Sequence, residues 1–231
     1  MALSALFLLA AYLLGSMPIV YLLARRHGVD LHQTGTRTVG GGNLWHQVSA
    51  LDGFLGTLAD TSKGALPPLI APLLGLGPWT AALGAVAAVL GQMWPVFLGF
   101  NGGRGNVTGM AALLVLAPGA LLVGMVPVLI GLFIKKVPDL VLREVSASLR
   151  SRFQGMRSRS LPLGVFLGVL TILPAAALLG YPISVAFAAG SIALFILVRR
   201  ATAELSRDRQ ATKDQRLAIL RSRLLYDRER P

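Results

Sequence analysis

Two glycine-rich segments of the chain hold the residue types that bind anions. The first glycine segment, residues 35–43, combines four glycines with two threonines, an arginine and an asparagine, and the second, residues 100–108, repeats this composition around Arg104. Glycines let successive backbone N–H groups converge on an anion, and arginine adds a charged donor, so both segments are typical of phosphate binding. A flexible loop would explain the first segment alone, but two such segments favour one shared anionic site. Neither matches a nucleotide-binding fingerprint.

Asp60 and Lys63 form a third candidate element, because they lie three residues apart inside an otherwise apolar stretch. That spacing puts both side chains on one face of a helix. Charges within a membrane span are costly, so we expect the pair to face the interior of the bundle and either to neutralise itself or to serve a ligand. Gly64 removes a side chain beside Lys63, so another helix or a substrate could approach closely.

The other reactive residue types support neither a metal site nor a covalent nucleophile. Three histidines occur, and none has the spacing of a metal-ligand set. We expect His27 and His32 to be solvated, and His46 to lie close enough to the first glycine segment to touch an anion. The chain has no cysteine, and no nucleophile elbow or histidine–aspartate acyltransferase pair is present.

The elements that must position these residues are apolar blocks. Hydrophobic residues make up 54% of the chain and charged residues only 14%, whereas soluble domains usually carry about 25% charged residues. The first block lacks a basic leading region and an Ala-x-Ala cleavage pattern, so we interpret it as a retained span rather than a signal peptide. The last block is long enough for two spans and is divided at Gly180-Tyr181-Pro182. The blocks cover approximately residues 2–24, 53–77, 79–100, 107–134 and 161–198.

The basic residues decide the topology. A net charge of +12 would suggest a nucleic-acid partner for a soluble protein, but the basic residues cluster between the apolar blocks, which is the pattern that orients membrane proteins. A single span over 107–134 would put the clusters on both sides of the membrane, whereas a hairpin broken at Pro118-Gly119 keeps them on one side. Its two short helices would have to be buried among neighbours.

We therefore predict an all-α polytopic membrane helix bundle of about seven transmembrane helices, with the N-terminus outside and the C-terminus cytoplasmic. Residues 1–200 form the membrane-embedded domain, and residues 201–231 form a basic cytoplasmic tail. A leucine stripe flanked by arginines predicts that this tail is an amphipathic helix on anionic lipid, and a solvated, partly disordered tail is the alternative.

The order of these motifs resembles the bacterial membrane-integral glycerol-3-phosphate acyltransferases that use acyl phosphate as donor. The family's Gly-Ser-x-Pro matches Gly15 to Pro18, its first glycine loop falls on Gly35 to Asn43, and its Asp-x-x-Lys-Gly falls on Asp60 to Gly64. Its long second motif aligns without gaps on Gly91 to Thr108, and Gly180-Tyr181-Pro182 matches a late turn. The resemblance covers most of the chain.

The chain departs from the family pattern within these motifs. In the first glycine segment, Thr36 stands for the family's serine and keeps a hydroxyl. In the second motif, Gln92 replaces histidine, Asn101 replaces the first lysine and Arg104 replaces the second. The family's final motif keeps Arg199-Arg200 but has Thr202 in place of asparagine, and residues 137–159 resemble an insertion.

The resemblance implies transfer of a fatty acyl group from acyl phosphate to the sn-1 hydroxyl of glycerol 3-phosphate, which forms lysophosphatidic acid in the inner membrane of the cell. Membrane lipids are the other expected partners, with no nucleic acid, metal or organic cofactor. The expected catalytic residues are Thr36, Lys63, Gln92 and Arg104. The expected substrate-binding residues are Gly35, Arg37, Thr38, Gly40, Gly41, Gly42, Asn43, His46, Asp60, Asn101, Gly102, Gly103, Gly105, Thr108, Ser160, Arg199 and Arg200.

Two other classes of function remain open at this stage. The substitutions at Gln92 and in the final motif would fit a catalytically impaired paralogue that binds phospholipid or acyl phosphate as a sensor or partner protein. A transporter is the third alternative. It is disfavoured because transporters usually carry internal repeats and midplane sites, and here the charges cluster at one face.

Overall fold

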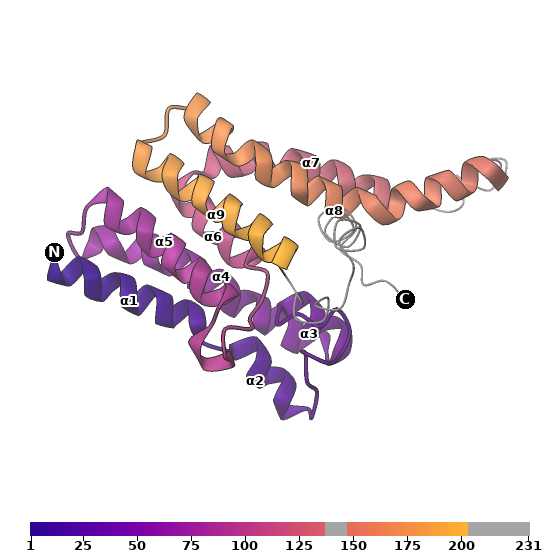
Figure 1. Ribbon diagram of the computed structural model, residues 1–231, viewed down its shortest axis with the longest axis horizontal. Coiled ribbons are helices and arrows are strands. Elements are labelled where there is room, and N and C mark those ends of the chain that lie inside the picture. Colours follow the sequence, from indigo (N-terminus) through magenta and orange to yellow (C-terminus); the bar gives the residue numbers. More distant parts are fainter. Residues whose placement is uncertain (137–146, 203–231) are drawn as a thin grey trace, which may run out of the picture.

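The computed structural model describes residues 1–136 and 147–202, and all regular structure in these ranges is helical (Figure 1). This confirms the predicted all-α class for the described residues. The elements in chain order are α1 (Ala2–Ser16), α2 (Ile19–Arg26), α3 (Gly41–Gln47), α4 (Ala50–Leu73), α5 (Pro78–Met93), the 3₁₀ turn η1 (Val96–Leu98), α6 (Asn106–Leu116), α7 (Pro118–Lys136), α8 (Ala147–Leu178) and α9 (Ile183–Thr202).

The long helices run back and forth between two ends of the molecule (Figure 1). At one end the turns before α7 and before α9 meet, because the backbone N–H of Gly119 donates to the hydroxyl of Tyr181 at 2.9 Å. The Trp79 ring, at the start of α5, lies 5.8 Å from the Phe187 ring of α9. The opposite end, which we name the loop end, carries the segments 27–40 and 94–105. Both glycine segments therefore lie at one end of the bundle.

The predicted hairpin within 107–134 is confirmed. Helix α6 ends at Leu116 and α7 begins at Pro118, and Ala117 between them has the non-helical angles φ −148° and ψ 64°. Proline is favoured at the first position of a helix because its missing N–H would have no helical partner there. The expectation that both short helices are buried is correct only for α6. Helix α7 packs mainly against α8 and exposes an apolar face that includes Leu122 and Phe133.

The first apolar block differs from the single helix that its hydropathy predicted. Helix α1 ends at Ser16 and α2 begins at Ile19, because Pro18 has no N–H for the helical ladder and its ring clashes with the preceding turn. The short α2 buries Val20 and Ala24. The residues of this break, Ser16, Met17 and Pro18, line a small pocket at the loop end.

Glycines allow two pairs of helices to pack closely. A Cβ atom at Gly15 would collide with the carbonyl oxygen of Ala88, so α1 and α5 cross with their backbones in contact. A Cβ atom at Gly64 would collide with the carbonyl oxygen of Thr108, so α4 and α6 do the same. The predicted close approach beside Lys63 is therefore confirmed, and its partner is helix α6.

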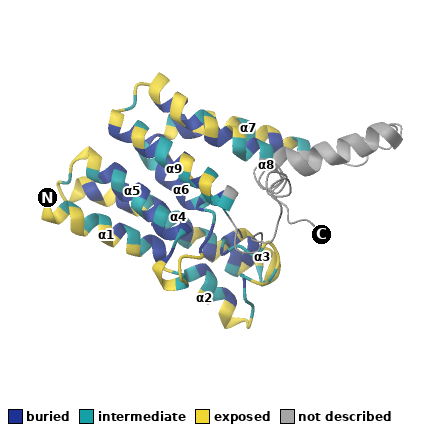
Figure 2. Cartoon of the chain, viewed as in Figure 1, coloured by how far each residue is buried: buried dark blue, intermediate teal, exposed yellow. Residues whose placement is uncertain are grey.

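The buried residues gather between the helices, and many large apolar side chains face outward (Figure 2). Three helical stretches of the described ranges are long and apolar enough to cross a membrane, Ala2–Arg26, Pro78–Leu98 and Ile183–Arg200. Outward apolar residues are expected where lipid replaces water as the solvent. Residues 137–146 of the predicted insertion and residues 203–231 of the predicted tail lie outside the described residues, as does the side chain of Ser160, whereas 147–159 form the first part of α8.

Candidate active site

The centre of the candidate site is a buried polar cluster that joins α4 to α5. The Nζ atom of Lys63 donates to Asp60 Oδ1 at 3.1 Å and to Gln92 Oε1 at 2.8 Å. The three residues are only 3%, 2% and 6% exposed in the order Asp60, Lys63 and Gln92. The predicted pairing of Asp60 with Lys63 is confirmed, and Gln92 joins it as a neutral third member. With both side chains ionised, the cluster carries no net charge.

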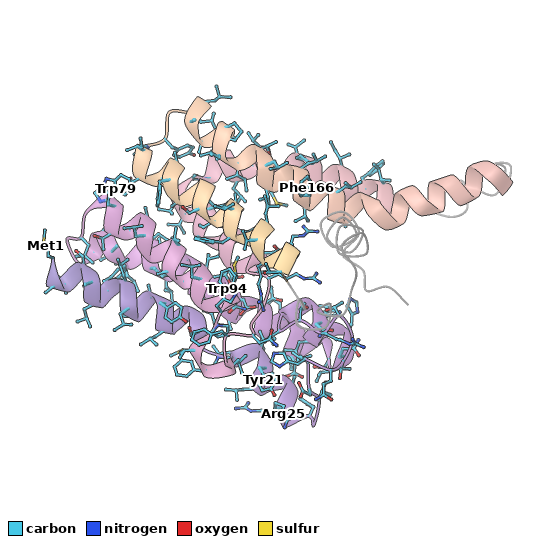
Figure 3. The ribbon with its side chains drawn as sticks, in the orientation of Figure 1. Met1, Tyr21, Arg25, Trp79, Trp94 and Phe166 are labelled. Carbon is cyan, nitrogen blue, oxygen red and sulfur yellow. The ribbon has the colours of Figure 1, made fainter. Side chains whose placement is uncertain are left out.

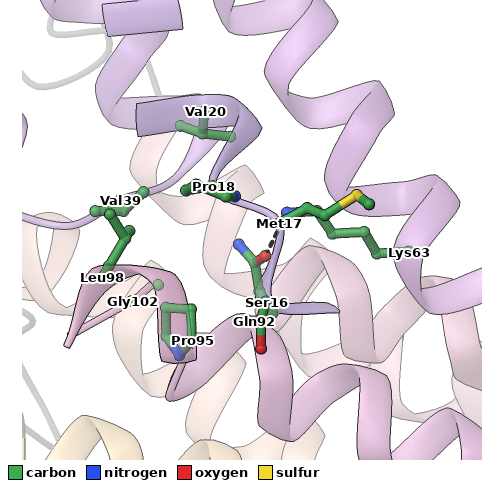
Figure 4. A pocket seen from close by; sticks show the side chains of 11 residues that line it. Ser16, Met17, Pro18, Val20, Val39, Lys63, Gln92, Pro95, Leu98 and Gly102 are labelled. Carbon is green, nitrogen blue, oxygen red and sulfur yellow. Dashed lines mark hydrogen bonds between the residues drawn. The ribbon is translucent and has the colours of Figure 1, made fainter. Parts of the chain in front are cut away.

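A small pocket lies against this cluster, with about 210 Å³ of empty space that includes the part open to solvent (Figure 4). It brings together the break after α1, the buried cluster and the second glycine segment. Figure 4 shows the hydrogen bond between Lys63 and Gln92 within its lining. The lining residues are Ser16, Met17, Pro18, Val20, Val39, Lys63, Gln92, Pro95, Leu98, Gly102 and Gly103.

The first glycine segment folds around the side chain of Asn43. Its Nδ2 atom donates to the carbonyl oxygens of Thr34 and Thr38 at 3.0 and 3.1 Å, and its Oδ1 atom accepts from the N–H of Thr36 at 3.0 Å. The hydroxyls of Thr36 and Thr38 lie 2.9 Å apart. Arg37, between them, adopts a left-handed φ of 54°. Asn43 therefore fixes the shape of the segment, and its amide is occupied by that task.

The second glycine segment folds back onto the end of α5. The N–H groups of Gly102 and Gly103 donate to the carbonyl oxygens of Met93 and Gln92, at 3.2 and 3.0 Å. These two amides are therefore engaged within the protein, unlike those of an anion cradle. Side chains at either position would collide with the surroundings, Gly102 with Gln92 and Gly103 with Val39. The glycines are needed here for close packing.

The two glycine segments lie against each other, as predicted. Val39 of the first segment has its carbonyl oxygen beside Gly103 of the second, and both line the pocket. A second link comes from His32, whose Nε2 lies 2.9 Å from the carbonyl oxygen of Asn101 and whose ring stacks on Tyr21 at 5.2 Å. Segments far apart in the sequence therefore form one surface at the loop end.

Helix α9 contributes Arg199 to the same surface. Its Nε atom donates to the carbonyl oxygen of Gly103 at 3.2 Å, and its Nη2 atom donates to the carbonyl oxygen of Gly102 at 2.9 Å and to Asn101 Oδ1 at 3.2 Å. Its guanidinium carbon lies 5.8 Å from the centre of the Trp94 ring. The positive charge of Arg104 also repels that of Arg199.

The remaining predicted site residues are distributed over the loop end. Thr36, Gly35, Gly42, His46 and Asn101 are exposed, whereas Arg37 and Arg104 are half-buried. Thr108 and Arg200 are buried, and the Thr108 hydroxyl has no hydrogen-bond partner among the described residues. None of the first segment's polar side chains lines the pocket, so that segment contributes Val39 alone to it.

Sequence reasoning missed the contacts of two histidines and one serine. His27 is exposed, as predicted, but its Nε2 lies 3.2 Å from Asp52 Oδ2, and the partly buried His32 contacts Asn101. Ser16 lines the pocket, and its hydroxyl is buried without a hydrogen-bond partner among the described residues. No local pattern could have found these contacts, because they join residues that are distant in the chain.

Figure 3 draws the side chains of this region, with Tyr21, Arg25 and Trp94 labelled at the loop end of the bundle. No group of three or more histidine, cysteine, aspartate or glutamate side chains that could hold a metal ion occurs within the described ranges. The charged groups of the site, as far as the structure describes it, are therefore one buried ion pair and several arginines nearer the surface.

Comparison with known proteins gives one consistent result. A family model described as "Glycerol-3-phosphate acyltransferase" matches residues 5–206. A protein of Rubrobacter xylanophilus named glycerol-3-phosphate acyltransferase is 42% identical over 116 residues, which cover 50% of this chain and 58% of that protein. The chain thus spans less than two thirds of this relative.

Two solved structures share the fold. One is the glycerol 3-phosphate form of PlsY (YgiH), described as an integral membrane glycerol 3-phosphate acyltransferase, with a TM-score of 0.67 and 29% identity over 85% of this chain and 88% of that one. The other is the lysophosphatidic acid form of the same protein, with a TM-score of 0.67 and 27% identity over 94% of this chain and 92% of that one.

Proposed function

The chain belongs to the glycerol-3-phosphate acyltransferase family, and on this premise we infer that it is an acyltransferase that forms lysophosphatidic acid from glycerol 3-phosphate. We propose acyl phosphate as the donor. The hydroxyl oxygen at the sn-1 position attacks the acyl carbon, the bond from that carbon to the phosphate oxygen breaks, and inorganic phosphate leaves with the hydroxyl proton. The product remains in the membrane.

The observation that carries this proposal is the buried Asp60–Lys63–Gln92 cluster, which borders a pocket that both glycine segments help to line. Both proposed substrates carry phosphate groups. Asp60 already neutralises the positive charge of Lys63. In this proposal the arginines nearer the surface, Arg37 and Arg104, therefore attract the substrate anions. Positive charges at the surface raise the local concentration of anionic substrates.

The proposed reaction requires the protein mainly to orient the two substrates. Acyl phosphate is already activated, so holding two reactants in line can supply about 7–11 kcal/mol without a covalent intermediate. Donors placed at the developing oxyanion would add roughly 3–4 kcal/mol. In this proposal Lys63 and Gln92 orient the reacting groups in the pocket, while Thr36, Arg37 and Arg104 contact phosphate oxygens.

We further propose a multi-pass topology in the inner membrane, with seven spans, the N-terminus outside and the loop end on the cytoplasmic side. The back-and-forth path of the helices and the positive clusters support it. Because the chain has no cysteine, single cysteines can report the sides. A maleimide that cannot cross membranes should label Phe97→Cys only in inverted vesicles and Leu74→Cys only in right-side-out vesicles. The reverse pattern would contradict the proposed orientation.

The activity is tested with protein purified in detergent and supplied with acyl phosphate and labelled glycerol 3-phosphate. Lysophosphatidic acid and inorganic phosphate should form in equal amounts, and acyl-CoA or glycerol without phosphate should not replace the substrates. The relatives' names favour the enzyme over a non-catalytic sensor. Thermal stabilisation by phosphate without any product would reverse that preference.

A further inference from the structure

The last turn of α9 holds the second glycine segment by one side chain. The Arg199 guanidinium donates to three acceptors that belong to consecutive residues, the Asn101 side chain and the carbonyl oxygens of Gly102 and Gly103. An arginine offers five N–H groups in a fixed planar fork, and this geometry matches several acceptors grouped in one plane. These three hydrogen bonds of Arg199 are therefore made within the protein, to two backbone carbonyl oxygens and to the Asn101 side chain.

The Trp94 ring supports the same arrangement from the end of α5. The Arg199 guanidinium carbon lies 5.8 Å from the ring centre, within the range of a cation–π contact. Trp94 immediately precedes Pro95, where the chain leaves α5 for the second glycine segment. Arg199 is thus fixed to both the start and the middle of the 94–105 connection.

A continuous set of hydrogen bonds leads from Arg199 to the pocket. The Gly103 carbonyl accepts from Arg199, and the Gly103 N–H donates to the backbone carbonyl of Gln92. The Gln92 side chain in turn accepts from Lys63. A displacement of Gly103 would therefore reach the residues that line the pocket.

A like charge acts near this connection. Arg104 follows Gly103 in the chain, and its positive charge acts against that of Arg199. Without the three hydrogen bonds, repulsion would favour moving the glycine segment and Arg104 away from α9.

We propose that Arg199 is a positioning residue that clamps the second glycine segment against α9, in place of the substrate-binding role that the sequence suggested for it. Its catalytic consequence rests on the proposed acyltransferase function, but the clamp itself does not. The decisive property is the planar fork and not the charge, so a lysine at this position keeps the charge and loses the clamp.

A spin label tests the clamp without any substrate. Because the chain has no cysteine, Phe97→Cys gives a single attachment site on an exposed residue of η1. Arg199→Ala and Arg199→Lys should both raise the mobility of this label, whereas the exposed control Arg26→Ala should not change it. An unchanged label mobility in both Arg199 variants, each verified as folded by its thermal unfolding, would overturn the proposal.

Turnover provides the second readout. A misplacement of about 1 Å can cost roughly 100-fold in rate, so we expect both Arg199 variants to lose about that factor in kcat/KM, while Arg26→Ala keeps wild-type turnover. Wild-type turnover by Arg199→Lys would show that charge suffices and would refute the clamp. If wild-type protein has no turnover but the label responds as expected, the clamp stands and the acyltransferase proposal fails.

Discussion

Replacing Asp60 by asparagine removes the negative charge that balances Lys63, and it leaves the shape of the side chain nearly unchanged. Both partners are almost fully buried, and Lys63 Nζ lies 3.1 Å from Asp60 Oδ1. Breaking a buried ion pair by removing one partner costs about 3–5 kcal/mol, because the remaining charge is left without compensation. For a chain of this size the melting temperature should fall by roughly 6–20 °C.

The loss of stability is measured by thermal unfolding in detergent, followed through intrinsic fluorescence. Ser62→Ala is the matched control, because Ser62 lies between the two partners in sequence and its hydroxyl donates only to a backbone carbonyl of its own helix. The control should change the free energy of unfolding by less than about 0.5 kcal/mol. A shift for Asp60→Asn as small as that of the control would refute the energetic importance of the pair.

The double variant Asp60→Asn/Lys63→Met separates stability from function. Replacing both charges by groups of similar volume is often neutral or stabilising, so much of the stability lost in Asp60→Asn should return. The Gln92 amide oxygen would lose its donor, which should leave a residual cost of about 1–3 kcal/mol. Turnover should remain lost if Lys63 orients substrate. Full turnover in this variant would assign the pair a structural role alone.

Three further predictions concern packing and charge. Gly64→Ala should force α4 and α6 apart and cost about 1–3 kcal/mol, whereas Gly77→Ala, where nothing lies within 4 Å, should cost less than about 1 kcal/mol in the same unfolding assay, from the change of helix N-cap alone. Tyr181→Phe should cost about 1 kcal/mol at the turn before α7 and leave turnover unchanged. Arg104→Ala should lower kcat/KM more than Arg37→Ala, because Arg104 occupies a basic position of the family; equal or reversed losses would refute this ordering.

The helical class and the 107–134 hairpin could be predicted because they depend on properties summed over many residues. Hydropathy indicates which segments enter the bilayer. The placement of the basic clusters excludes topologies that would put these clusters on both sides of the membrane. The turn at Ala117 follows from the charge pattern more than from any turn signal. The break after Ser16 was missed because apolar residues continue on both sides of Pro18.

The site could be predicted in its residues and only partly in its contacts. The spacing of Asp60 and Lys63 already predicts a pair, because three residues bring two side chains to one helix face. The role of Gly102 and Gly103 could not be predicted. Glycine serves equally for an anion cradle and for close packing, and only the tertiary fold shows that both amides donate to α5 carbonyls.

The departures from the family pattern fit one another within this structure. Gln92, in the place of a histidine, supplies a neutral acceptor for Lys63, so Lys63 has a hydrogen-bond partner at position 92 that does not titrate. Asn101, in the place of a lysine, accepts a hydrogen bond from Arg199, where a lysine would bring a second positive charge against the guanidinium. Arg104 keeps the positive charge of its position. Each of these three residues therefore makes a specific interaction or keeps the charge of its position, so none of the three departures leaves an unfilled place in the described site.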